Sequence, residues 1–389
     1  MDICAELFSL LRSEICEAQL DEETKNAITP ETLSKLYKLS KKHDLAHLVA
    51  DALDKNGLLP TDGEIKKRFL YERNMAVYRY EQINYELGEI CRVLEEEQIE
   101  HIPLKGSVLR RYYPEPWMRT SCDIDILVKE ADLKKARSVL VEKLDYKYDG
   151  ENMHDVQLWA PSGVHLELHF DLVEDYIAKK ATPILHSVWE RTKPYPECNY
   201  RLEMTDEMFY FYHLAHMGKH FIYGGCGIRS FLDVWVLTHK ITYHEENRAK
   251  LLKKGGLYQF AIGVENLSDV WFEEKAHTPM TLTMETYILQ GGIYGTNENK
   301  SLLGRGKKGN KIKYIAYRIF MPYGELCCIY PRLAKRKWLY PFYTVKRWFT
   351  RLFQGKLKKS INEAKTVSNL QTEKIDNMKE LLANLGLDK

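Results

Sequence analysis

Residues 122–128 have the sequence CDIDILV, and this stretch decides the fold. Side chains alternate between the two faces of a β-strand, so Asp123 and Asp125 share one face while the branched apolar residues share the other. Two neighbouring carboxylates on a half-buried strand repel each other unless a cation lies between them. Divalent ions bind carboxylate oxygens, so the pattern predicts a metal-binding strand. An edge strand with one face in solvent fits it equally well.

A second alternating stretch, VHLELHFDL at 164–172, supplies a candidate partner strand. Its polar side chains His165, Glu167, His169 and Asp171 share one face. If this strand lies beside the first, Glu167 joins the two aspartates, and Asp171 is the alternative third carboxylate. Three carboxylates can hold two Mg²⁺ ions about 3.5–4 Å apart, an arrangement used in phosphoryl transfer. A strand with one hydrated face is the simpler explanation.

A third feature is the segment IEHIPLKG at 99–106, which predicts a strand ending at Gly106. Gly106 would allow a sharp turn after Lys105, and Ser107 would begin the next helix. Free N–H groups at the start of a helix favour a bound phosphate. Ordinary turn chemistry explains the same three residues without a ligand.

The rest of the chain divides by its hydrophobic periodicity. Apolar spacing predicts short helices at the N-terminus, a long helix from Ala76 to Glu97, and helices again from Thr205 onward. Between them, short strands alternate with helices, with a hairpin turn at Pro161-Ser162-Gly163. We therefore predict an α+β fold, with a small mixed β-sheet core flanked by N-terminal and C-terminal helical regions. The predicted segments are an N-terminal helical region (1–75), the core (76–204), a helical domain (205–300), a basic aromatic segment (301–360) and a polar tail or single surface helix (361–389).

Composition predicts a globular cytoplasmic protein. Hydrophobic residues make up 44% of the chain and charged residues 29%, which is ordinary for globular proteins. The first residues, MDICAELFSLLRSE, lack the apolar core of a signal peptide, and no stretch approaches the ~18 apolar residues of a membrane span. The 8 cysteines show no paired spacing, which predicts reduced thiols.

Together, a strand ending in Gly-Ser, a strand with Asp-x-Asp and a third acid on a later strand resemble the signature of the polymerase-β nucleotidyltransferase superfamily. The chain is more closely similar, over about residues 35–355, to the uncharacterised nucleotidyltransferase family found in bacteria. That family more often has Asp where Glu167 stands. The matching segments are LKG (104–106), Tyr112-Tyr113-Pro114, Arg119, DIDILV (123–128), ELHF (167–170), His213 to His216 with Lys219-His220, Arg229 to Asp233, and YPRL and YPFYTVKRWF from 330 onward.

The resemblance implies an enzyme that transfers a nucleoside monophosphate from an NTP to an acceptor that the resemblance does not name. Its cofactor would be Mg²⁺ or Mn²⁺, and its catalytic and metal-binding carboxylates would be Asp123, Asp125 and Glu167. Lys105 and Arg119 would neutralise the triphosphate. The full set of nucleotide-binding residues would be Lys105, Gly106, Ser107 and Arg119. The alternative is a non-catalytic protein on the same fold that senses a nucleotide or binds a partner.

Two further pairs of residues, each containing arginine, allow either a functional or a purely structural interpretation. Arg110 and Arg111 could face the triphosphate, although exposed helix positions explain them more simply. Arg229 and Asp233 have the spacing of an ion pair within one helix, with substrate contact as the alternative.

Three histidines, His213, His216 and His220, recur on one face of a predicted helix. A zinc site is one interpretation. Partly buried histidines, or histidines that face a nucleotide cleft, fit the spacing better.

The segment 301–360 contains sixteen Lys or Arg residues and a single acid, Glu325. Within it, 332–353 mixes basic and aromatic side chains. Three interpretations compete for these residues: a helix on an anionic membrane surface, a nucleic-acid contact, and a helix that packs its aromatic rings on the core and keeps its lysines in water. The third is the simplest.

The two aspartates also carry an expectation about stability. Because Asp123 and Asp125 repel each other, Asp125→Asn is expected to leave metal-free thermal stability unchanged or slightly raised.

Overall fold

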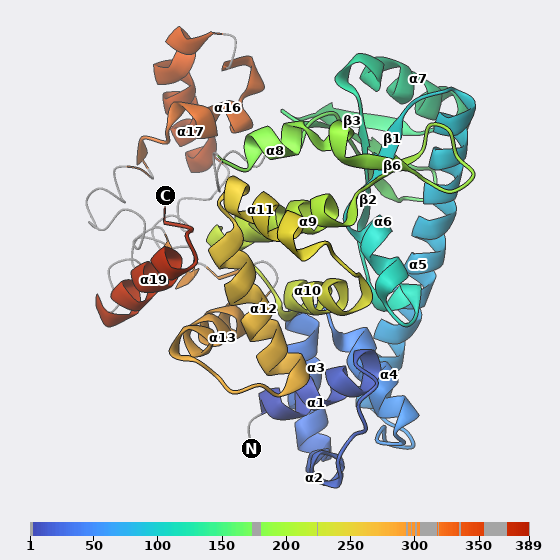
Figure 1. Ribbon diagram of the computed structural model, residues 1–389, viewed down its shortest axis with the longest axis vertical. Helices are drawn as coiled ribbons and strands as arrows, with labels where there is room; N and C mark the ends of the chain where they lie inside the picture. The colour runs from blue at the N-terminus through green and yellow to red at the C-terminus, as the bar shows by residue number, and fades with distance from the viewer. Residues whose placement is uncertain are drawn as a thin grey trace.

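The protein's structure, a computed structural model, has an α+β architecture with a five-stranded mixed sheet and flanking helices (Figure 1). This confirms the predicted fold class. No helix in the described ranges is both long and apolar enough to pass through a bilayer. The structure describes residues 3–172, 180–223, 225–292, 319–333, 336–353 and 372–388 and the positions 295, 296, 298, 299, 302, 303 and 317.

The five-stranded sheet has the order β1-β2-β5-β4-β3. The β2–β5 pair is parallel, whereas β1–β2, β4–β5 and β3–β4 are antiparallel. The predicted hairpin joins β4 to β5 through Gly163, whose φ of +85° glycine adopts without strain. The strands are β1 (His101–Pro103), β2 (Asp123–Val128), β3 (Lys147–Glu151), β4 (Asp155–Trp159) and β5 (His165–His169).

One face of this sheet packs against helices α5 (Glu64–Glu96) and α7 (Leu133–Leu144). Ile124, Ile126 and Leu166 on the strands are fully buried in one apolar cluster with side chains of both helices. Burying each such side chain contributes about 1.5–3 kcal/mol. Because side chains alternate, this packing assigns the carboxylates of β2 and β5 to the opposite face of the sheet.

Helix α5 begins at Glu64, twelve residues before the predicted start at Ala76. Its first three turns are mostly polar, and Phe69 is the fully buried side chain there, so the apolar periodicity that marks a helix is weak. The predicted boundary between residues 75 and 76 therefore falls inside one continuous helix.

Four short helices precede α5, as the sequence predicts. Asp21 and Thr29 cap the second and third, because each side chain accepts a hydrogen bond from the backbone N–H three residues later. The first helix packs against the fourth and against α12 (Tyr258–Glu273), so the N-terminal region joins the main core. The helices are α1 (Ile3–Ile15), α2 (Glu22–Ala27), α3 (Pro30–Lys42) and α4 (Ala46–Lys55).

Strand β3 was not predicted. Its sequence, KYDGE, is rich in residues that disfavour strands, and four of its five side chains are exposed. It forms through pairing with β4, with a register shift between Tyr148 and Gly150.

The region from 182 to 291 is mainly helical. Helix α9 begins directly after Thr205, as predicted, although the Thr205 side chain makes no capping hydrogen bond. Apart from its exposed polar residues, α9 is buried along most of its length and lies at the centre of the helical part (Figure 1). The elements are α8 (Thr182–His186), β6 (Thr192–Pro194), β7 (Leu202–Met204), α9 (Asp206–Ile222), α10 (Ile228–Lys240), α11 (Glu245–Gly255), α12 (Tyr258–Glu273) and α13 (Pro279–Gly291).

The C-terminal part holds α16 (Tyr323–Ile329), α17 (Tyr340–Phe353) and α19 (Thr372–Asn384). Of the two predicted forms, a polar tail or a single surface helix, 372–384 forms a helix, and α19 packs on α13 with its apolar side buried in the main core. The part of the predicted tail before 372 and much of the basic segment lie outside the described residues.

A buried carboxylate, Glu14, links α1 to α4. It lies 2.6 Å from Lys55 Nζ. Burial raises the pKa of Glu14 to about 7, with Lys55 lowering it and Asp51 raising it. An unfolded chain has a glutamate pKa of about 4.3. Glu14 therefore stabilises the fold fully below about pH 4.3, and this contribution is lost as the pH rises through about 7.

Replacing Glu14 by Gln should therefore flatten the pH dependence of stability. Between pH 5 and pH 7 the unfolding free energy of wild type should fall by about 1–2 kcal/mol relative to that of the variant. Urea denaturation over this range measures it, with the exposed Glu23→Gln as the control. Identical slopes for wild type and Glu14→Gln would contradict the assignment.

Candidate active site

The predicted carboxylates meet where β2 and β5 run side by side. The parallel register aligns Asp125 with Glu167. An oxygen of Asp125, an oxygen of Glu167 and a ring nitrogen of His169 all lie within 4.8 Å of one another. Asp125 is only 3% exposed. A carboxylate so deeply buried keeps its charge only with close partners.

Lys105 is the first of these partners. Its Nζ lies 2.7 Å from Asp125 Oδ1 and 3.9 Å from Glu167 Oε2. Burial lowers the pKa of Lys105, but Asp125, with smaller contributions from Tyr212 and Glu167, raises it well above its ordinary value. Burial likewise raises the pKa of Asp125, but Lys105 and His169 outweigh it and hold that pKa well below its usual range. Both groups are therefore charged at neutral pH.

The backbone at Lys105 is strained, with a φ of +46°. This conformation costs a residue with a side chain on the order of 1–3 kcal/mol. It lies at the turn between β1 and the four-residue helix α6 (Gly106–Leu109). The turn is where the chain leaves the sheet edge and directs the ammonium group towards Asp125.

His169 is the second partner, and the sequence assigned it no role. Its Nε2 lies 2.9 Å from Asp125 Oδ1 and 3.5 Å from Glu167 Oε2. Burial lowers the pKa of His169, but its hydrogen bonds to Asp125 and Glu167 raise it. Its Nδ1 is buried with no hydrogen-bond partner in the described part of the chain. The strict alternation of β5, which puts residue 169 on the face of Glu167, was the signal that could have identified it.

Asp123 lies one step before this cluster on the same face. It is half-buried, and burial, then the charge of Asp125, raises its pKa. Asp123 is not among the three groups within 4.8 Å, so the structure brings Asp125 and Glu167 together and leaves Asp123 adjacent.

Gly106 and Ser107 form the wall beside Lys105. A Cβ at Gly106 would lie 3.0 Å from Ser121 Cβ, so the close approach of these two segments favours glycine. The Ser107 N–H already donates to the Leu104 carbonyl. Its Oγ is buried and has no hydrogen-bond partner among the described residues, so the hydroxyl can donate to a ligand.

Arg119 does not face the cluster. It is 9% exposed, and its Nε and Nη2 donate to the two carboxylate oxygens of Asp233 at 2.6 and 2.8 Å. Its Nη1 donates to the Thr120 carbonyl. These hydrogen bonds join Arg119 to α10, and its contact with a triphosphate stays a prediction.

Two of the other three arginines, Arg229 and Arg110, also differ from the predictions. Arg229 pairs with Asp44 in the N-terminal region and not with Asp233. Arg110, expected to be exposed, is buried, and its Nη2 donates to Ser121 Oγ at 2.7 Å. Arg111 is exposed as expected and pairs with Glu203 at 2.6 Å.

The alternative carboxylate and the helix histidines lie outside the cluster. Asp171 follows the end of β5 and pairs with His186 at 3.3 Å. His213 is buried, whereas the Nε2 atoms of His216 and His220 lie 3.0 Å apart. The metal-capable groups found in the described ranges include none of these four residues.

A second metal-capable group shares His169. It consists of His154, Asp155 and His169, and Asp155 is as buried as Asp125. Asn152 Nδ2 donates to Asp155 Oδ1 at 2.9 Å, and His154 Nε2 lies 3.2 Å from Oδ2. This group therefore has local partners for both carboxylate oxygens, and it contains one carboxylate where the first has two.

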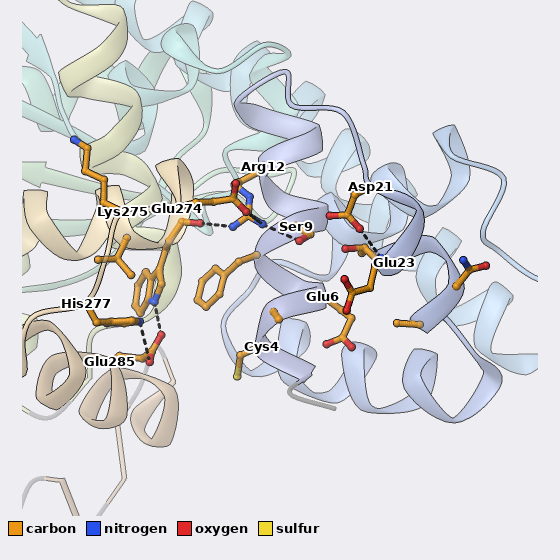
Figure 2. A pocket seen from close by; sticks show the side chains of 17 residues that line it. Cys4, Glu6, Ser9, Arg12, Asp21, Glu23, Glu274, Lys275, His277 and Glu285 are labelled. Atoms are coloured by element: carbon orange, nitrogen blue, oxygen red, sulfur yellow. Dashed lines mark hydrogen bonds and ion pairs between the residues drawn. The ribbon is translucent and has the colours of Figure 1, made fainter.

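A cavity of about 830 Å³ lies elsewhere, between the first two helices and α12 and α13 (Figure 2). Arg12 crosses it and donates to the Trp271 carbonyl at 3.1 Å, and Trp271 Nε1 donates to Glu285 at 2.7 Å. None of the residues that line it belongs to the carboxylate cluster. We interpret this cavity as a packing gap between helices and not as a ligand site.

The donor set at the cluster fits a divalent cation. Two carboxylates from adjacent strands present oxygens close together, which hard cations prefer. The Nε2 of His169 carries the proton that it donates to Asp125, whereas its Nδ1 has no hydrogen-bond partner among the described residues. Asp125, Glu167 and Asp123 would hold the ion, with His169 as the nitrogen alternative for Mn²⁺.

Comparison with known proteins gives one match. A family model described as an uncharacterised nucleotidyltransferase matches residues 29–261, which is more than half of the chain and includes the whole cluster. No curated protein and no solved structure matches.

Proposed function

The chain belongs to the uncharacterised nucleotidyltransferase family, and from this premise we propose that it transfers a nucleoside monophosphate from an NTP, ATP among them, to an acceptor. The cofactor would be Mg²⁺ or Mn²⁺, with Asp123, Asp125 and Glu167 as its ligands. The observation that most supports the proposal is the buried cluster on β2 and β5. A solvent-facing edge strand does not account for it, because β2 lies between two other strands.

Each residue of the site would have a separate task. Lys105 would neutralise part of the triphosphate charge, since its ammonium lies at the carboxylates. Ser107 would donate its unpartnered hydroxyl to a phosphate oxygen, and Glu167, half-buried, would accept the proton of the acceptor. When bound, the divalent ion would stabilise negative charge on the phosphate oxygens. His169 would position the Asp125 carboxylate.

The proposal places the enzyme in the cytoplasm, where NTPs are present and thiols stay reduced. The seven cysteines whose side chains the structure describes are reduced, which supports this location.

Nucleotide binding is expected to depend on Lys105 and on a divalent ion. Lys105→Met should weaken the affinity for MgATP roughly 10- to 100-fold, because a desolvated charge-assisted contact contributes about 1.5–3 kcal/mol. Calorimetry with and without Mg²⁺ measures this. Lys129→Met, which removes an exposed cation just after β2, is the matched control and should bind as wild type. Unchanged affinity in EDTA would instead support a nucleotide sensor that does not use a metal.

A further inference from the structure

Helix α17 presents its apolar side to solvent. Phe342, Val345 and Phe349 share one face of α17, and Trp338 lies in the 3-10 turn Lys337–Leu339 just before it; we call these four residues the apolar stripe. They are 76, 62, 42 and 54% exposed. The prediction that this segment packs its aromatic rings on the core is therefore wrong for these three rings.

The opposite side of α17 is more polar, although it is the buried one. Thr344 and Arg347 are about 5% exposed or less, and Tyr340 OH donates to the Met321 carbonyl at 2.7 Å. A helix that only needs to pack on a water-soluble protein has the reverse arrangement, with apolar residues inside. The inversion indicates that the stripe contacts something other than the described part of this chain.

Exposed cations flank the stripe in the sequence, and the ammonium groups of Lys337 and Lys346 lie over the Tyr323 and Tyr330 rings. Between 319 and 353 there are seven Lys or Arg residues against one acid. Arg332, Arg336, Lys337 and Lys346 are all exposed. The surface therefore combines apolar side chains with positive charge. A partner that fits it has an apolar interior and a negatively charged boundary.

We propose that α17 docks this protein on a bilayer containing anionic phospholipids, with the apolar stripe inserted at the level of the headgroups. At 1.5 Å per residue its 14 residues extend about 21 Å, so the helix lies in the plane of the interface. Trp338 and the two phenylalanines enter the acyl boundary, while the lysines and arginines contact lipid phosphates.

A bilayer fits this surface better than a nucleic acid does. Nucleic-acid surfaces interleave bases with aromatic rings and place cations along the phosphate track. Here three exposed aromatic rings are joined by the aliphatic Val345, and among the described residues no exposed cation interrupts the i, i+3, i+7 series of Phe342, Val345 and Phe349. The proposal is independent of nucleotidyl transfer.

Co-sedimentation of the full chain with vesicles tests the proposal. Wild type should bind phosphatidylcholine vesicles that contain phosphatidylglycerol and should bind pure phosphatidylcholine much more weakly. Phe342→Ser with Phe349→Ser should weaken binding at least ~10-fold. Lys337→Gln and Lys346→Gln should each weaken it roughly fivefold at low salt.

The control pair is Tyr78→Ser with Tyr85→Ser on α5. Those rings have the same seven-residue spacing and are 59 and 69% exposed, so loss of aromatic area alone affects both pairs equally. The control should bind vesicles as wild type does, and circular dichroism should show both variants folded. The proposal would be overturned if wild type does not bind anionic vesicles, or if the two double variants lose vesicle binding equally. It would also be overturned if wild type binds a single-stranded oligonucleotide and not vesicles. A stripe-dependent dimer without vesicle binding would overturn it as well.

Discussion

Asp125→Asn is expected to reduce nucleotidyl transfer at least ~10³-fold while the protein remains folded. The amide keeps the shape of the carboxylate but removes the charge that the divalent ion requires. The same substitution leaves Lys105 partly buried, 2.7 Å from a neutral group. We therefore expect the metal-free unfolding free energy to fall by about 2–4 kcal/mol. The sequence predicted no loss, because it showed the repulsion from Asp123 and not the pairing with Lys105.

The matched control is Asp155→Asn. Asp155 has the same 3% exposure and lies on β4, the strand next to β5. Its variant should keep transfer activity within a few fold. If Asp155→Asn abolishes transfer and Asp125→Asn does not, the ion belongs to the group of His154, Asp155 and His169. Label transfer measures activity, and urea denaturation without metal measures stability.

Asp233→Asn should cost about 3–5 kcal/mol of unfolding free energy, the largest loss of stability we expect from a single change. Asp233 is 1% exposed and accepts two hydrogen bonds from Arg119 and one from Tyr113 OH at 2.7 Å. Burial raises the pKa of Asp233, but Arg119 outweighs it and holds that pKa below its usual range. The amide would leave the Arg119 charge buried without a counter-ion.

A double-mutant cycle with Arg119→Met separates this structural role from nucleotide binding. The loss in the double variant should fall short of the summed single losses by about 1–3 kcal/mol, because the two side chains act as one pair. MgATP affinity should stay near wild type in every variant that remains folded. If Arg119→Met keeps wild-type stability but binds MgATP more weakly, Arg119 contacts the triphosphate and its role is not structural.

Alternation along two strands was enough to predict that Asp125 and Glu167 lie together. A period of two fixes which residues share a face, and the apolar partners of Asp125 and Glu167 are numerous enough to decide which face is buried. The parallel pairing then brings the carboxylates together. Asp123 shares the face, but its distance from the cluster depends on side-chain placement, which periodicity does not determine.

Partners distant in sequence could not be predicted in this way. Arg119 and Asp233 are 114 residues apart, and the four-residue spacing of Arg229 and Asp233 suggested a local pair instead. Local spacing shows which pairs a helix permits, whereas burial decides which pair forms. For the same reason the buried side of α17 could not be predicted. Its inner side packs in a cluster of tyrosines with Leu326 and Leu333, and the more apolar stripe lies outside.

The position of the transferred label tests nucleotidyl transfer most directly. The protein is incubated with Mg²⁺, a cell extract as the source of acceptor, and NTPs labelled at either the α- or the γ-phosphate. We predict that α-label enters an acceptor, that γ-label leaves as pyrophosphate, and that Asp125→Asn stops both while Asp155→Asn does not. Transfer of γ-label, transfer that persists in Asp125→Asn, or no transfer from any of the four NTPs would contradict the account.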